Sequence, residues 1–122
     1  VDYTLLYVDD DQFQHRLLKV VIDNERYKLV NSTSAVEGLK ILRSLTPDLI
    51  LLDLDMPEMN GLEFLSYVRS SEKFSSIPVI MATGRKEKEV VSECIGAGAS
   101  DYIVKPFERQ ALISKIERCI FG

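Results

Sequence analysis

The sequence predicts an α/β fold, a doubly wound sheet of five parallel strands with helices on both faces. Short apolar runs alternate five times with segments whose apolar residues recur at helical spacing, which is typical of a mostly parallel sheet. Polar or charged residues follow several of these runs at the carboxyl end, where such sheets carry their binding sites. A chain of 122 residues without linkers or low-complexity segments fits one compact domain, residues 1–122.

The first half of the chain contains three predicted strands and two predicted helices. Apolar runs bounded by polar residues predict strands over Thr4–Val8, Tyr27–Val30 and Leu49–Asp53. Helical spacing of apolar residues predicts helices over Gln12–Asn24 and Ala35–Leu45, and Pro47 follows the second helix. The residues expected to face the core are Phe13, Leu17, Val20 and Val21 in the first helix and Val36, Leu39 and Leu42 in the second.

The second half repeats the pattern with two strands and three helices. Strands are predicted over Val79–Ala82, directly after Pro78, and over Asp101–Val104. The predicted helices cover Gly61–Val68, Lys86–Ala97 and Glu108–Ile120. The last two carry their apolar stripes through Val90, Val91, Cys94 and Ile95, and through Leu112, Ile113, Ile116 and Cys119. Gly98 is placed to end the fourth helix in the left-handed conformation.

Strand polarity predicts the order of the sheet. The first, third and fourth strands are nearly unbroken apolar runs, as expected for interior strands, whereas the second and fifth alternate with polar residues, as edge strands do. The order 2-1-3-4-5, numbered along the chain, fits this pattern and keeps every crossover right-handed. Ligands bind such sheets at the carboxyl ends of the strands where the order reverses, here between the first and third strands.

Composition and charge exclude several classes of function. Hydrophobic residues make up 46% and charged residues 28% of the chain, and the net charge is -4 without a basic stripe, so we expect no direct nucleic-acid binding. No apolar run approaches the roughly 20 residues of a membrane span. Cys94 and Cys119 lack metal-ligand spacing and are expected to be reduced thiols, which favours a cytoplasmic setting.

Five residues at strand ends predict a site. Asp9 and Asp10 follow the first strand, Asp53 ends the third, Thr83 follows the fourth and Lys105 follows the fifth. Three converging carboxylates repel one another unless a cation lies among them, so the pattern indicates a divalent-metal site that handles a phosphoryl group.

Each of these residues also has a purely structural interpretation. Acids at strand ends often cap the following helix, and Asp11 is best explained in this way. Thr83 alone fits a turn, Lys105 alone a solvated charge, and Tyr102 an edge-strand packing residue. His15, a lone histidine in the first helix, is expected at the surface rather than in a phosphate relay.

Four motifs in order carry a resemblance to a known family. They are Val8-Asp9-Asp10-Asp11, Leu52-Asp53-Leu54-Asp55-Met56-Pro57 with Gly61, Met81-Ala82-Thr83-Gly84, and Asp101 through Phe107 with Lys105-Pro106 inside it. From about Thr4 to Ile120 the chain resembles a CheY-like response-regulator receiver domain of two-component signalling. The resemblance implies the flavodoxin/CheY-like fold, for which the strand order above is already known.

The resemblance also implies residue roles. Asp53 would be the phosphoacceptor, with Mg²⁺ or Mn²⁺ held by Asp9, Asp10, Asp53 and the backbone carbonyl of Asp55. Thr83 and Lys105, the latter before a cis proline bond, would contact the phosphoryl group. Tyr102 would then move inward as Thr83 is drawn toward that group.

The implied partners follow from these roles. A sensor histidine kinase or a histidine phosphotransfer protein would dock near the first helix and donate the phosphoryl group. A downstream effector domain or protein would bind the surface of the fourth helix, fifth strand and fifth helix, and dimerisation on phosphorylation is left open. The chain would be a signalling phosphoprotein rather than an enzyme, although it would assist its own phosphorylation and autodephosphorylation, and no membrane contact is expected.

Alternatives from other classes remain open. A haloacid-dehalogenase-type phosphatase also carries an Asp-x-Asp motif such as Asp53-Leu54-Asp55, but Lys105-Pro106 stands where a further acidic loop is expected. A flavodoxin fits less well, because the loop after the first strand is acidic rather than rich in glycine and hydroxyl groups. A receiver that serves as a phosphorylation-independent interaction module would lack a key residue, and none is missing.

Overall fold

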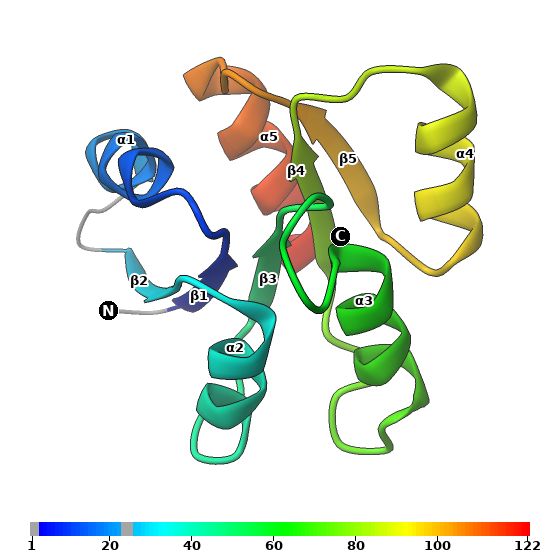
Figure 1. Cartoon of the computed structure of the whole chain (residues 1–122). Helices are drawn as coiled ribbons and strands as arrows, with labels where there is room; N and C mark the ends of the chain where they lie inside the picture. The colour runs from blue at the N-terminus through cyan, green and yellow to red at the C-terminus, as the bar shows by residue number, and fades with distance from the viewer. Residues whose placement is uncertain (1–2, 23–25) are drawn as a thin grey trace.

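The computed structural model describes residues 3–22 and 26–122 and shows one parallel sheet surrounded by helices (Figure 1). The strands are β1 (Tyr3–Val8), β2 (Tyr27–Ser32), β3 (Leu49–Leu52), β4 (Val79–Thr83) and β5 (Asp101–Val104). The helices are α1 (Gln12–Ile22), α2 (Ala35–Leu42), α3 (Gly61–Ser70), α4 (Lys88–Gly96) and α5 (Arg109–Phe121). None of the helices in these two ranges is long and apolar enough to cross a membrane.

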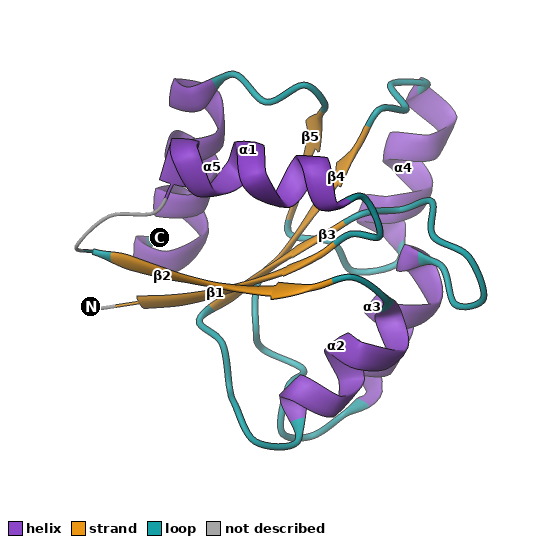
Figure 2. Cartoon of the chain, turned by 60° about the vertical axis from the view of Figure 1, so that its left-hand side comes forward, coloured by secondary structure: helices purple, strands orange, loops and turns teal. Residues whose placement is uncertain are grey.

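The strand order is β2-β1-β3-β4-β5 with all pairs parallel, as the sequence predicted. β3 and β4 are buried along their whole length, and the polar strands β2 and β5 form the two edges. Figure 2 shows α1 and α5 over one face of the sheet and α2 and α3 over the other. The order therefore reverses between β1 and β3, where the acidic residues were expected.

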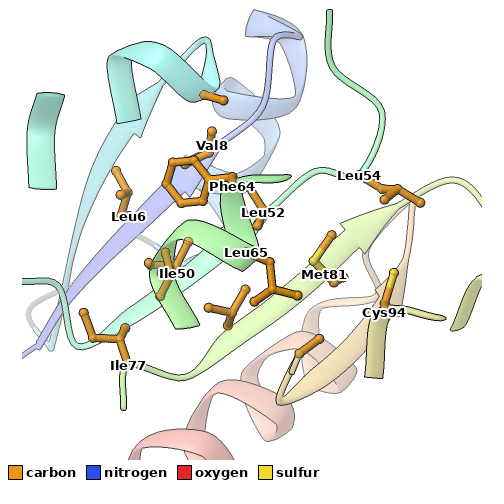
Figure 3. Packing of buried hydrophobic residues seen from close by; sticks show 14 of the residues in the cluster. Leu6, Val8, Ile50, Leu52, Leu54, Phe64, Leu65, Ile77, Met81 and Cys94 are labelled. Carbon is orange, nitrogen blue, oxygen red and sulfur yellow. The ribbon is translucent and has the colours of Figure 1, made fainter. Parts of the chain in front are cut away.

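The sheet separates two apolar layers. The larger layer fills the space between the sheet and α2, α3 and α4, and Phe64 and Leu65 of α3 lie at its centre over Leu6, Ile50 and Leu52 (Figure 3). The second layer packs α1 and α5 against the other face and includes Leu5, Tyr7, Leu18, Leu51, Ile80, Leu112 and Ile116. The two layers cover both faces of the central strands, and the residues at the strand ends extend from this packed sheet.

The predicted inner face of α1 is wrong for Phe13, Leu17 and Val20, whereas Val21 is partly buried and packs against the core as predicted. The buried residues of α1 are His15, Leu18 and Ile22, whereas Phe13, Leu17 and Val20 are 58%, 40% and 86% exposed. Both sets share the helical period, so periodicity alone did not decide which of them faces the sheet. The surface position predicted for His15 is wrong for the same reason, since its side chain is only 7% exposed.

Smaller differences concern helix ends and edges. α2 ends at Leu42 rather than Leu45, Val36 and Ile95 are exposed instead of buried, and the predicted extension of the first helix over 23–24 lies outside the described residues. Gly98 does follow α4 with a φ of 110°, which confirms the predicted left-handed residue.

Candidate functional site

The three predicted acidic residues meet at the carboxyl edge of β1 and β3. Asp9, Asp10 and Asp53 each present one carboxylate oxygen, and these oxygens lie within 4.8 Å of one another. Asp9 and Asp53 are buried, whereas Asp10 is exposed. The backbone aligns the two strand ends, because the amide of Asp53 donates to the carbonyl of Val8 at 2.9 Å. Oxygen ligands of this kind suit a hard cation such as Mg²⁺.

Lys105 reaches this cluster from the end of β5. Its ammonium nitrogen donates to Asp9 Oδ2 and lies 3.5 Å from Asp53 Oδ1, and its side chain is only 14% exposed. The Lys105–Pro106 peptide bond is cis, as the resemblance implied. The Lys105 amide also donates to the carbonyl of Thr83 at 2.8 Å, which ties the ends of β4 and β5 together.

Asp9 is held from several directions. The Tyr7 hydroxyl donates to Asp9 Oδ2 at 2.6 Å, and the amide of Asp11 donates to Asp9 Oδ1 at 2.9 Å. Burial, followed by the hydrogen bond to Asp9, raises the pKa of Tyr7, so the phenol stays protonated and donates. Asp11 accepts from the amide of Phe13 at 2.9 Å, which confirms its predicted role at the start of α1.

The Asp53 carboxyl is electrostatically strained in this arrangement. Burial raises its pKa from 3.8 to about 6, Lys105 opposes the rise, and the charge of Asp9 adds to it. Lys105 therefore does not offset the combined effect of burial and of the neighbouring acids on Asp53. A divalent cation among the three carboxylates would do so, and the residues present fit such an ion in number and in chemistry.

Thr83 and Tyr102 both form hydrogen bonds with the backbone of Arg85. Thr83 is buried at the end of β4, and its hydroxyl accepts from the amide of Arg85 at 3.4 Å. The Tyr102 hydroxyl donates to the Arg85 carbonyl, and its side chain is only 8% exposed. Tyr102 is thus already turned inward in this structure, and its movement on phosphorylation stays a prediction.

The loop after β3 fixes the backbone around the acceptor. A Cβ on Gly61 would lie 2.3 Å from the Asp53 carbonyl oxygen, so a side chain larger than hydrogen does not fit there. Gly61 also donates its amide to the Leu54 carbonyl at 2.9 Å, and the side chain of Asn60 caps α3 in a reciprocal pair with Glu63.

The roles of two residues that support the site were not predicted from the sequence. Tyr7 was read as a strand residue, and His15 was expected on the surface, yet Tyr7 binds the Asp9 carboxylate and His15 Nε2 lies 2.7 Å from the Asp9 carbonyl oxygen. One signal was available for Tyr7, because residues two apart on a strand share a face. No comparable signal pointed to His15.

An exposed ion pair joins the two loops that follow Asp53 and Thr83. Arg85 Nη1 lies 3.3 Å from Asp55 Oδ1, and both side chains are about half exposed. If Asp53 forms an acyl phosphate and this ion pair shields it from water, Asp55→Ala and Arg85→Ala will each speed autodephosphorylation. The double variant will then be no faster than the faster single variant. An exposed pair is worth at most about 1 kcal/mol, so the change should not exceed about fivefold. Loss of label in a chase measures the rates, and strictly additive effects would rule out coupling.

Comparison with known proteins identifies the family. The sequence profile of the response regulator receiver domain matches residues 5–117. The chain belongs to the response-regulator receiver family. This membership favours a receiver over the haloacid-dehalogenase-type phosphatase and the flavodoxin.

Individual relatives agree with a receiver domain. The chemotaxis protein CheY of Listeria monocytogenes is 32% identical over 115 residues, which cover 93% of this chain and 95% of CheY. The sensor histidine kinase CheAY of Helicobacter pylori is 32% identical over 121 residues, 98% of this chain but 15% of the kinase. The chain likewise spans only 7% and 16% of two other sensor kinases that it matches. Receiver sequences of this kind therefore occur both alone and within much longer proteins.

Solved structures share the same fold. A putative response regulator from Chloroflexus aurantiacus superposes with a TM-score of 0.92 at 29% identity, over 100% of both chains. The receiver domain of the sensor histidine kinase PA1611 from Pseudomonas aeruginosa, at 22% identity and a TM-score of 0.90 over 100% of both chains, has a magnesium ion coordinated in its active site cleft. The chain thus has the flavodoxin/CheY-like fold and is a receiver domain of two-component signalling.

Proposed function

We propose that Asp53 accepts a phosphoryl group from a phosphohistidine in a Mg²⁺-dependent reaction. The observation that carries this proposal is the convergence of Asp9, Asp10 and Asp53 within 4.8 Å, with the Lys105 ammonium 3.5 Å from Asp53. A carboxylate that is buried beside a lysine and two further acids is placed to act as a nucleophile once a cation reduces the repulsion.

The chemistry requires one bond to form and one to break. An oxygen of Asp53 attacks the phosphorus, the P–N bond to the donor histidine breaks, and the imidazole leaves. Lys105 then contacts a phosphoryl oxygen with its ammonium group, and the Thr83 hydroxyl donates to another. Catalysis consists of positioning and charge stabilisation, as in other phosphoryl transfers. The product is an acyl phosphate, and its later loss is a slow self-hydrolysis rather than enzymatic turnover.

The metal-binding residues are Asp9, Asp10, Asp53 and the backbone carbonyl of Asp55. All four supply oxygen, which suits Mg²⁺ or Mn²⁺ better than softer-ligand metals. When bound, the ion offsets negative charge on the carboxylates and on the phosphoryl group.

Phosphorylation would be read out through Thr83 and Tyr102. The new dianion draws the Thr83 hydroxyl away from the Arg85 amide, to which it is now bonded at 3.4 Å. The Arg85 carbonyl also accepts from Tyr102, so a shift of Thr83 would reach Tyr102 through Arg85. The equilibrium between the two arrangements of Thr83 and Tyr102 then biases the surface of α4, β5 and α5. An effector domain, an effector protein or a second copy binds this surface.

The donor would dock on α1. Phe13, Leu17 and Val20 form an exposed apolar face on this helix. Next to it lies a groove of about 310 Å³ lined by Gln14, Leu17, Val20, Val21, Pro106 and Phe107. Pro106 directly follows Lys105, so a helix seated here would hold its phosphohistidine near the acidic cluster. A sensor histidine kinase or a histidine phosphotransfer protein is the expected donor.

The experiment that tests the function is phosphorylation by acetyl phosphate. The chain should take up one phosphoryl group when Mg²⁺ is present, and EDTA should reduce uptake to background. Intact mass measures the phosphorylated product. Beryllofluoride with Mg²⁺ should change the NMR spectrum of the chain in the same way as phosphorylation by acetyl phosphate does. Failure of both reagents would favour a phosphorylation-independent interaction module, and turnover of a phosphomonoester would favour a phosphatase.

A further inference from the structure

Two buried side chains contact Asp9 from the α1 side of the sheet, and neither takes part in the steps above. Tyr7, which is 0% exposed, donates its hydroxyl to Asp9 Oδ2 at 2.6 Å. His15, which is 7% exposed, places Nε2 2.7 Å from the Asp9 carbonyl oxygen. One group therefore binds the side chain of Asp9 and the other binds its backbone.

These two side chains also support each other. Their ring centroids lie 4.6 Å apart with an interplanar angle of 52°, and Phe107 approaches Tyr7 from the β5–α5 loop at 6.3 Å. His15 Nδ1 lies 2.7 Å from Asn31 Oδ1, so the ring is fixed at both nitrogens between β1 and β2. A carbonyl oxygen only accepts hydrogen bonds, so Nε2 carries the ring hydrogen and donates a hydrogen bond to the Asp9 carbonyl.

We propose that Tyr7 and His15 are positioning residues for the metal site. Tyr7 fixes the orientation of the Asp9 carboxylate, and His15 fixes the peptide that joins Asp9 to Asp10 and with it the direction of the Asp10 carboxylate. Asp10 needs this support because it is the exposed member of the cluster. Groups that orient metal ligands typically change metal affinity by about 10- to 100-fold when removed.

The Lys105 ammonium competes with a metal ion for the Asp9 carboxylate, and the orientation of that carboxylate therefore matters. Lys105 donates to the same Asp9 oxygen as Tyr7. Without the hydroxyl, this oxygen keeps its bond to Lys105 and the other oxygen keeps its bond to the Asp11 amide, so the lysine rather than the phenol then orients the carboxylate. The metal then loses one preoriented ligand, although no ligand has been deleted.

Tyr7→Phe tests this role because it removes the hydroxyl and keeps the ring. Isothermal titration of the metal-free chain with Mg²⁺ should give a dissociation constant raised by about tenfold. Tyr27→Phe is the matched control, since Tyr27 is also buried, at 3% exposure, but stands at the opposite end of the sheet, paired with Tyr3. It should leave the dissociation constant unchanged. An unchanged constant in Tyr7→Phe would overturn the role of Tyr7.

His15 is tested by a pair of variants that differ in one donor. His15→Leu should weaken Mg²⁺ binding, and His15→Gln, whose amide can donate to the Asp9 carbonyl, should restore part of the affinity. Asn31→Ala provides a variant at an exposed position if His15→Leu does not fold, and it should also weaken binding because it frees the ring. A merely structural role would lower the urea midpoint in all three without moving the Mg²⁺ constant.

This proposal depends on the metal binding proposed above, and the two fail in different ways. If the wild-type chain binds no Mg²⁺ and takes up no phosphoryl group, the proposed function itself is wrong. If the wild type does both and the Tyr7 and His15 variants match it in Mg²⁺ affinity, only the positioning role is wrong.

Discussion

Asp53→Asn is expected to abolish phosphorylation by acetyl phosphate and by any phosphohistidine donor. The amide of asparagine is far less nucleophilic than a carboxylate, and it does not form an acyl phosphate. The substitution keeps the size of the side chain, which is 8% exposed, so the fold should tolerate it. Intact mass after incubation with acetyl phosphate and Mg²⁺ should show full uptake by the wild type and none by the variant.

Asp55→Asn is the matched control for this loss. It makes the same chemical change two residues further along, where the side chain is exposed and faces Arg85. The backbone carbonyl that we expect to bind Mg²⁺ is unchanged by this substitution. Uptake should therefore persist in Asp55→Asn, and a label that survives in Asp53→Asn would refute the acceptor assignment.

The strand order could be predicted from the sequence because a strand that is buried on both faces is apolar along its whole length. β3 and β4 read as unbroken apolar runs, and β2 and β5 alternate with polar residues. This contrast separates interior strands from edges without reference to any distant contact. The register of each pair, such as Leu52 opposite Met81, follows from packing that the sequence pattern does not specify.

The acidic cluster was predictable for a related reason. Parallel strands bring their carboxyl ends to one edge, so Asp9, Asp53 and Lys105 had to lie near each other once the order was known. Of the two supporting groups, Tyr7 could be inferred from the strand period, whereas His15 could not. A helical period fits two faces of α1 equally well, and the burial of His15 depends on polar partners for both ring nitrogens, which Asp9 and Asn31 supply.

Asp53→Asn is also expected to stabilise the metal-free domain at neutral pH. Burial raises the pKa of Asp53 from 3.8 to about 6 in the folded state, and the charge of Asp9 contributes, so the folded chain holds this proton more tightly than the unfolded chain. The stability of the wild type should therefore fall as pH rises from about 4 to about 6. The full effect is at most about 3 kcal/mol, and it persists at higher pH.

Urea unfolding in EDTA between pH 4.5 and 8 measures this effect. At pH 7.5 the Asp53→Asn variant should be the more stable protein, and its advantage should shrink steadily as the pH falls toward 4. Glu72→Gln removes one negative charge at an exposed position and should show no such pH-dependent advantage. Added Mg²⁺ should stabilise the wild type more than the variant, because it compensates the charge that the variant lacks. If the variant is no more stable at pH 7.5, or if its advantage grows in acid, then burial and the neighbouring acids do not raise the pKa of Asp53 in the folded chain.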